Sequence, residues 1–357
     1  MKIVLITDTH WGVRSDAIEF LDNNKRFLDT TFFPTLEKEN ITTIIHLGDL
    51  VDRRKYLNIY TSKRLREDFL DPIREMNIDY HQIIGNHDVF YKNTNSVNSF
   101  REIFGNEKSF KFYENTTEVE FDGVKMLFVP WICDDNRQHT FQLIGETNAQ
   151  ICMGHLELEG FEMHRGAPLS HGYDRNTFSR FDIVVSGHYH HKSDVGNIHY
   201  LGSHGEFTWS DYDDPKGFHI FDTQTRELTF IVNPFTMFHK VWYDDKTIPA
   251  KELLNTDFSK YNNSYVKLVV QSKKNATTFD TFTTKLYEVN PIDVSIVDDH
   301  INMDKIEDNT LVNETEDTMT SLAKYIKMLE TDVDKNALEV LMRSLYNEAM
   351  QMEISET

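Results

Sequence analysis

The sequence predicts an α/β fold in which buried strands lie between layers of helices. Residues 2–7 form an apolar run that ends abruptly in polar residues, which is typical of a buried strand. Strand-like and helix-like segments then alternate up to about residue 84, and this alternation favours a layered α/β sheet. With 39% hydrophobic and 12% aromatic residues among 357, the chain can fill a large core, so a mainly disordered state is excluded.

The elements of the first half follow from their periodicity. Apolar residues recur at helical spacing over about 16–38 and again over about 59–76, which predicts two long amphipathic helices. The β-branched segment 41–47 and the segment 80–84 predict two further strands. A further helix is expected near 94–104. This helix and the one at 59–76 either pack on the core or form a helical dimer interface, and periodicity alone leaves both interpretations open.

Beyond residue 110 short strands dominate. The segments 116–121 and 124–129 are joined by Asp122-Gly123, a favoured two-residue turn, and predict a hairpin. Further short strands are expected at 149–153, 181–186, 198–202, 218–221 and 228–232.

We expect four segments along the chain. The main domain spans 1–236, and a small α+β capping domain at 237–295 has a strand at 265–270 and a helix at 277–287. An acidic linker follows at 296–317. The tail at 318–352 has the pattern of two amphipathic helices, which either pack on their own chain or dock onto a partner.

The net charge of −21 argues at first against a nucleic-acid partner. Residues 291–357, however, hold 16 acidic and 5 basic groups, a net of −11, so about half of the negative charge lies there. No apolar run of about 18 residues is present, so we expect no membrane span, and the short apolar start is not that of a signal peptide. The two cysteines, Cys133 and Cys152, are interpreted as buried small hydrophobes in a reducing compartment.

Residues that commonly bind metals follow five of the predicted strands directly. These segments are Asp8-Thr9-His10, Gly48-Asp49-Leu50-Val51-Asp52-Arg53, Gly85-Asn86-His87-Asp88, Gly154-His155 and Gly187-His188-Tyr189-His190. Because ligands of open α/β sheets bind beyond the carboxyl ends of strands, we expect all five segments at one edge.

The donor types indicate a two-metal site. Carboxylate, imidazole and amide oxygen together suit manganese, iron or zinc better than calcium. The donors are too many for one tetrahedral ion but fit two ions about 3.5–4 Å apart that share a carboxylate. Such a pair suits hydrolysis of a phosphate ester, since it makes hydroxide available near neutral pH.

The series D-x-H, G-D-x-x-D, G-N-H-D, G-H and G-H-x-H over residues 8–190 resembles the calcineurin-like metallophosphoesterases. Within them the chain is most similar to nuclease subunits of the SbcD type, the meiotic recombination 11 family, and to their phage recombination endonuclease branch. Pro130-Trp131, Gly202-Ser203 and the domain order contribute to this narrower resemblance. It implies a four-layer αββα sandwich with a small cap domain and a helical tail.

The resemblance also implies an activity and partners. The implied activity is manganese-dependent exonuclease and endonuclease cleavage of DNA in recombination, repair and replication. The implied partners are a second copy of the chain, in a homodimer, and a coiled-coil ATPase of the SbcC type, which we expect the tail helices to dock. The expected location is the cytoplasm, that of the host if the gene is carried by a phage.

The resemblance assigns roles residue by residue. The first ion is expected to be bound by Asp8, His10 and His190, and the second by Asn86, His155 and His188, with Asp49 bridging the two. His87 is expected to contact the scissile phosphate or leaving oxygen, with Asp88 orienting it. Asp52 stands where some nuclease relatives carry a histidine.

Other interpretations stay open. The segment 48–53 is also reminiscent of phosphoprotein phosphatases, and a metal-free assembly scaffold is a third possibility. Trp11 is interpreted as a core wall, with base stacking as the alternative, and Arg53-Arg54-Lys55 as a solvated loop or a contact to the DNA backbone. His191, His199 and His204 are interpreted as surface or supporting residues, His204 with a substrate-facing alternative. The lysines considered for DNA clamping by the cap are Lys267, Lys273, Lys274 and Lys285.

Overall fold

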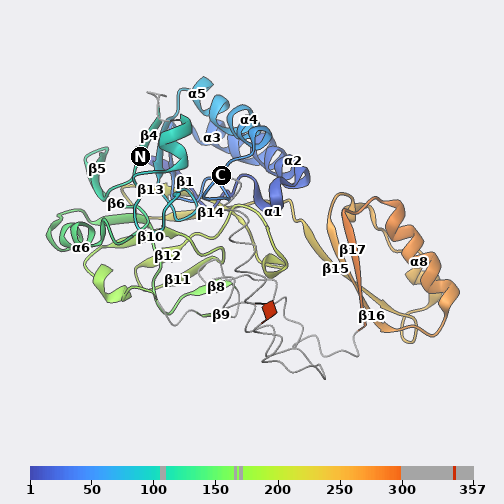
Figure 1. Ribbon diagram of the computed structural model, residues 1–357. Helices are drawn as coiled ribbons and strands as arrows, with labels where there is room; N and C mark the ends of the chain where they lie inside the picture. The colour runs from blue at the N-terminus through green and yellow to red at the C-terminus, as the bar shows by residue number, and fades with distance from the viewer. Residues whose placement is uncertain (105–109, 165–166, 169–171, 299–340, 343–357) are drawn as a thin grey trace. The chain divides into compact units, whose positions relative to one another are not determined.

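The computed structural model describes residues 1–104, 110–164, 167–168, 172–298 and 341–342 (Figure 1). Residues 1–298 form one compact unit. The expected tail at 318–352 and nearly all of the expected linker at 296–317 lie outside the described residues, although Leu341 and Met342 are described and helical.

Two six-stranded sheets form the centre of the fold. Their strand orders are β14-β13-β1-β2-β3-β4 and β11-β12-β10-β7-β6-β5. The first sheet consists of β1 (Lys2–Ile6), β2 (Thr43–His46), β3 (Asp79–Ile83), β4 (Phe110–Tyr113), β13 (Gly217–Asp222) and β14 (Leu228–Val232). The second consists of β5 (Thr117–Phe121), β6 (Val124–Val129), β7 (Ile151–His155), β10 (Ile183–Gly187), β11 (Ser193–Val195) and β12 (Ile198–Tyr200). Strands β1 to β4 are parallel, as are β6, β7, β10 and β12, so within each set the carboxyl ends lie at one edge.

The two sheets pack face to face through an apolar core, where Leu5 and Ile45 of the first sheet share a cluster with Phe128, Met153 and Val185 of the second. A separate cluster joins the outer face of the first sheet to helices, and another joins the outer face of the second sheet to helix α6 (Arg137–Glu146). This arrangement of helix, sheet, sheet and helix confirms the predicted four-layer αββα sandwich.

The two long predicted helices are present, but each contains a wider π-helical turn. The first is formed by α2 (Ile18–Phe27), η1 (Leu28–Phe32) and α3 (Phe33–Glu39), and the second by α4 (Ile59–Leu65), η2 (Arg66–Leu70) and α5 (Asp71–Glu75). In each, a proline, Pro34 or Pro72, stands at the start of the last segment. Because proline has no N–H to donate to the preceding turn, the widened turns are explained by these prolines.

Short elements complete the main domain. They are α1 (Val13–Asp16), η3 (Phe100–Phe104), β8 (Glu162–His164), β9 (Ala167–Pro168), η4 (Arg175–Phe178) and η5 (Trp209–Asp211). The helix expected near 94–104 is therefore confined to its last five residues. In α1 the backbone is left-handed at Arg14, Ser15 and Asp16, which makes a tight turn between β1 and α2. Among the described residues, no helix has the length and apolarity needed to cross a membrane.

A third sheet begins at Phe238. It is parallel and consists of β15 (Phe238–Asp244), β16 (Tyr265–Ser272) and β17 (Asp293–Asp298). Helix α8 (Ala276–Glu288) covers one face, with α7 (Ala250–Leu253) and η6 (Ser259–Tyr261) close by in the sequence. Strand β17 continues to Asp298, three residues beyond the expected boundary at 295, because Leu268 to Val270 of β16 still offer pairing positions there.

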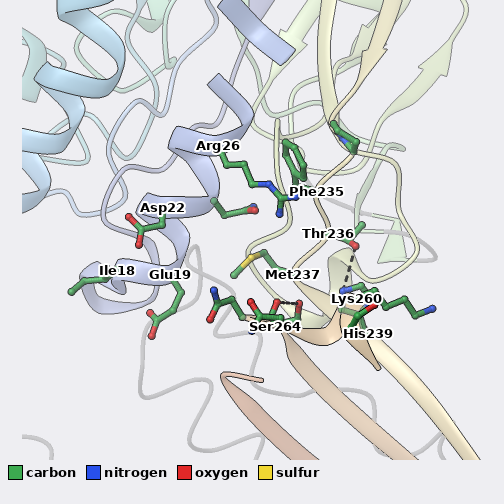
Figure 2. A pocket seen from close by; sticks show the side chains of 15 residues that line it. Ile18, Glu19, Asp22, Arg26, Phe235, Thr236, Met237, His239, Lys260 and Ser264 are labelled. Carbon is green, nitrogen blue, oxygen red and sulfur yellow. Dashed lines mark hydrogen bonds between the residues drawn. The ribbon is translucent and has the colours of Figure 1, made fainter. Parts of the chain in front are cut away.

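The third sheet meets the main domain beside α2. Phe20 of α2 packs in one cluster with Phe207, Met237 and Phe238. Next to this contact lies a cavity of about 780 Å³ between α2 and the start of β15. Figure 2 shows Arg26 of α2 reaching Phe235 at its rim, where the guanidinium carbon lies 3.9 Å from the ring centroid.

Candidate metal centre

The five predicted segments do lie at one edge of the sandwich. Three of them follow the adjacent parallel strands β1, β2 and β3 of the first sheet, and the other two end β7 and follow β10, which are adjacent and parallel in the second. The loops bond to one another directly: the N–H of Asp8 donates to the carbonyl of Gly48 (3.0 Å), and that of His10 to the carbonyl of Asp49 (3.1 Å). Chain topology therefore gathers residues that are far apart in the sequence.

A first group of side chains surrounds Asp8. Its Oδ1 lies 3.9 Å from Nε2 of His10 and 3.9 Å from Nε2 of His190. The same two imidazole nitrogens are 3.0 Å apart. These are the three residues that we expected around the first ion, and their donor atoms all face one point.

A second group surrounds Asn86. Its Oδ1 lies 2.8 Å from Nε2 of His155 and 3.0 Å from Nδ1 of His188. Asp49 lies between the two groups, because its Oδ2 is 3.2 Å from Nε2 of His155 and 3.8 Å from Nε2 of His10. All seven residues expected as ligands are thus brought together.

The hydrogen bonding of His155 suits a cation. Its Nδ1 lies 2.8 Å from the carbonyl oxygen of Leu47, which can only accept, so Nδ1 carries the proton. In the neutral ring, Nε2 then presents a lone pair to the group. Asp49 and the Asn86 oxygen add acceptor atoms that repel each other unless positive charge lies between them. These clusters could hold divalent metal ions.

Electrostatics also favour positive charge here. Asp8 and Asp49 are fully buried. Burial raises the pKa of Asp8; for Asp49 the imidazoles of His155, His87 and His10 overcome burial and hold its pKa well below its usual range. Burial lowers the pKa of His155, but Asp49 and Asp8 outweigh it and raise that pKa to about 9.

His87 approaches the first group from the loop after β3. Its ring lies edge-on to that of His10, with the centroids 4.8 Å apart. The backbone N–H of His87 donates to Oδ1 of Asp49 (2.8 Å). Its Nδ1 lies 2.5 Å from the carbonyl oxygen of Asp52.

The role expected of Asp88 needs a correction. Its two carboxylate oxygens accept the backbone N–H groups of Gly85 (2.8 Å), Asp49 (2.9 Å) and Leu50 (2.9 Å). Asp88 therefore joins the loops after β2 and β3, whereas the main-chain oxygen of Asp52 is the group that faces Nδ1 of His87. Sequence reasoning missed this contact because a backbone oxygen leaves no trace in residue type.

Glycine is required where the loops cross. A Cβ at Gly85 would overlap both Oδ1 and the amide nitrogen of Asp49, and one at Gly187 would overlap the hydroxyl of Thr7. The glycines in the motifs therefore permit close approach of the loops that carry the site.

The structure shows the surroundings of several residues whose roles the sequence left open. Trp11 is buried in the core cluster, where its ring centroid lies 6.4 Å from that of Phe69, so it forms a wall of the core. His204 is also buried, with Nε2 2.9 Å from the amide oxygen of Asn24, so it does not face a substrate. Arg53 forms an ion pair with Asp16 (3.2 Å).

Two of the four cap lysines are engaged within the cap. Lys285 donates to the carbonyl of Leu254 (2.6 Å), and the ammonium of Lys273 lies 4.0 Å from the ring centroid of Phe279.

Two aromatic residues beside the site were not predicted as part of it. The Phe207 ring lies edge-on to both His10 and His190, with centroids 5.6 Å and 5.7 Å away. The Trp131 ring centroid lies 5.2 Å from that of His188. Phe207 belongs to no motif, and only the fold reveals it.

Comparison with known families supports the same site. The model of the calcineurin-like phosphoesterase family matches residues 1–192, which contain all five segments. The chain belongs to the calcineurin-like phosphoesterase family. Members of this family use divalent metals, which agrees with the donor clusters described above.

Three relatives match nearly the full length. Exonuclease subunit 1 of Enterobacteria phage T4 is 32% identical over 98% of this chain and 100% of its own length. The SbcD subunit of the SbcCD nuclease from Staphylococcus epidermidis is 24% identical over 96% of this chain and 99% of its own length. The protein of the same name from Staphylococcus saprophyticus is 26% identical over 97% of this chain and 93% of its own length.

Proposed function

We propose that this chain is a metal-dependent DNA nuclease, the exonuclease and endonuclease subunit of a recombination and DNA end-processing complex. The observation that carries the proposal is the position of Asp49, whose Oδ2 lies between an imidazole of each donor group. A shared carboxylate of this kind is the hallmark of a two-metal site for phosphate-ester hydrolysis. DNA as the substrate is supported by the names of the relatives.

The ligand sets follow the two donor groups. Asp8, His10 and His190 would hold one ion, Asn86, His155 and His188 would hold the other, and Asp49 would be shared between the two. Manganese is the proposed metal because the resemblance to SbcD-type nucleases implies it; the mixture of imidazole, carboxylate and amide oxygen suits manganese, iron or zinc. When bound, the two ions supply a hydroxide near neutral pH and neutralise charge on the phosphate.

The protein side chains then orient the substrate and handle the proton. Since the carbonyl of Asp52 engages Nδ1 of His87, we assign Nε2 to the scissile phosphate or the leaving oxygen, to which it gives a proton. Asp88 keeps the loops of Asp49 and His87 in register through its backbone contacts.

The decisive experiment is cleavage of labelled DNA in manganese by the wild type and by His87→Ala. We expect two manganese ions bound per chain in both proteins and a loss of cleavage of about 10²–10⁴-fold in the variant. A phosphopeptide tested in parallel should remain intact. Hydrolysis of the phosphopeptide alone would favour a phosphoprotein phosphatase, and the absence of bound metal would favour a metal-free scaffold. Equal cleavage of DNA by both proteins would refute the role of His87.

We also propose a homodimer. Exposed apolar side chains of α4 and of the region before β4 gather on one surface, where Ile59 is 89% exposed and Ile103 44% exposed, and both line one hollow. Exposed apolar patches of this kind commonly mark protein interfaces.

The proposed partner is a coiled-coil ATPase of the SbcC type, docked by the tail at 318–352 beyond the linker and the capping domain at 237–295. The names of the relatives as subunits support a complex. Deletion of residues 315–357 should abolish binding of the ATPase and leave manganese-dependent cleavage of single strands intact. Unchanged co-purification of the ATPase would refute this docking role.

A further inference from the structure

A buried lysine lies behind the first group of proposed metal ligands, which consists of Asp8, His10 and His190. The Lys216 side chain is only 4% exposed, and its ammonium lies 2.8 Å from Oδ1 of Asp211 and 2.8 Å from Oδ2 of Asp214. Its third contact is with the carbonyl oxygen of His190, at 2.7 Å. An ammonium so deeply buried is tolerated only with such partners, so its position is strongly determined.

The contacts of Lys216 fix the backbone that carries His190. The next residue, His191, is held as well, because its Nδ1 lies 2.9 Å from Oδ1 of Asp214. The imidazole of His190 branches from the backbone next to these two contacts, one at the carbonyl of His190 and one at the side chain of His191. Its direction toward Asp8 therefore depends on the lysine and its two carboxylates.

The same lysine controls the loop of Phe207. Oδ2 of Asp211 accepts the N–H of Phe207 (2.8 Å) and that of Thr208 (3.0 Å). The ring of Phe207 in turn packs edge-on against His10 and His190. Lys216 and Asp211 thus support this histidine pair from two directions.

Glu206 continues the network into the third sheet. It is 3% exposed, and its Oε2 accepts the N–H of Met237 (2.6 Å) and the N–H of Phe238 (2.9 Å), where β15 begins. Since Glu206 immediately precedes Phe207, one short loop contacts the donor group on one side and the start of the third sheet on the other.

We propose that Lys216, Asp211 and Glu206 are positioning residues that set the His10–His190 pair and couple its geometry to the placement of the third sheet. This inference rests on the proposed two-metal function. None of the three contacts the proposed substrate; they act through His190 and Phe207. Groups that orient metal ligands in this way typically contribute about 10–100-fold to metal affinity.

The first test replaces the ammonium. Lys216→Met should raise the manganese dissociation constant of one of the two ions about 10–100-fold, measured by calorimetry and by the spin resonance of free manganese, with the other ion less affected. The matched control is Lys192→Met, which removes a lysine two residues from His190 whose ammonium pairs with Asp194 (3.3 Å). It should bind both ions as the wild type does. Two unchanged constants in Lys216→Met, or two constants weakened equally, would overturn the proposal.

The second test does not depend on whether Lys216→Met folds. Glu206→Gln keeps an oxygen that can accept both N–H groups, whereas Glu206→Leu removes it. We expect faster hydrogen exchange at the amides of residues 237 and 238 together with weaker binding of one ion in the leucine variant, and near wild-type behaviour in the glutamine variant. Faster exchange with unchanged manganese binding would refute the coupling.

Failure of the proposed function has a different signature. If the wild type itself binds no manganese, the two-metal function is wrong. If the wild type binds two ions and all variants bind them equally well, only the positioning network is refuted.

Discussion

Nε2 of His10 lies 3.0 Å from Nε2 of His190, although the two residues are 180 positions apart in the chain. Two imidazole nitrogens face each other at this distance only when a proton or a cation lies between them. Oδ1 of Asp8, at 3.9 Å from both, completes a pocket for positive charge.

Manganese should therefore stabilise the folded chain. At a concentration of about 100 times the dissociation constant, one bound ion adds about 2.7 kcal/mol to the free energy of unfolding, and hence several degrees to the melting temperature. Asp49→Asn should lose most of this gain, because it removes the charge shared by both groups. Thermal melts with chelator and with manganese provide the measurement, and an equal shift in both proteins would contradict the bridging position.

Gly85→Ala should damage both the fold and the site. The new Cβ would overlap Oδ1 and the amide nitrogen of Asp49, so we expect a loss of at least about 1–3 kcal/mol of stability and weaker manganese binding. Gly145→Ala is the control: it lies in α6 with no atom within 4 Å of the added Cβ. It should be neutral or slightly stabilising, and similar losses in both variants would refute the argument from close approach.

The pH dependence of stability should carry the signature of Glu206. Burial raises its pKa to about 7 despite its two N–H donors, from an ordinary value of about 4.5. The folded state thus holds this proton more tightly than the unfolded state, so the contribution of Glu206 to stability is lost as the pH rises from about 4.5 to 7.

Glu206→Gln removes this titration. Its free energy of unfolding relative to the wild type should increase between about pH 5 and 7 and level off above about 8, with each unit of pKa shift corresponding to about 1.4 kcal/mol. Denaturant unfolding of both metal-free proteins across this range gives the difference. Parallel curves would show that Glu206 does not titrate in this window.

The proposed dimer should depend on the exposed residues of α4 and η3. Light scattering should show a wild-type dimer and a monomer for Ile59→Lys combined with Ile103→Lys, because two buried charges disrupt an apolar interface. Val195→Lys, at a position 38% exposed on β11, is the control and should remain dimeric. A double variant that stays dimeric would place the interface elsewhere.

Most of the fold was predictable because its signals are local. The Asp122-Gly123 turn predicts the β5–β6 hairpin, and the apolar periodicity at 16–38 and 59–76 predicts the two long helices. Strand β15 was not predicted as a separate element, since His239 and Lys240 interrupt its apolar pattern, and its pairing partner β16 lies far along the chain, beyond α7 and η6.

The candidate site divides in the same way. Motifs directly after strands identified Asp8, Asn86 and His188 and their neighbours, because a strand end and a donor residue are both visible in the sequence. Roles that depend on one particular contact were not visible, and the expectation that Asp88 orients His87 was corrected by the contacts of its carboxylate oxygens.

The order of the strands and the chemical types of the metal-binding residues can be read from short stretches of sequence. They were sufficient to predict the fold class and a site at one edge of the sheets. The distance between His10 and His190, the buried position of Lys216 and the link from Glu206 to Phe238 belong to tertiary structure alone. Lys216 and Glu206 bond to backbone groups of His190 and Phe238, which every residue type offers in similar form, so no pattern of residue types could predict these two contacts. The distance between His10 and His190 follows from how the loops of the two sheets pack together.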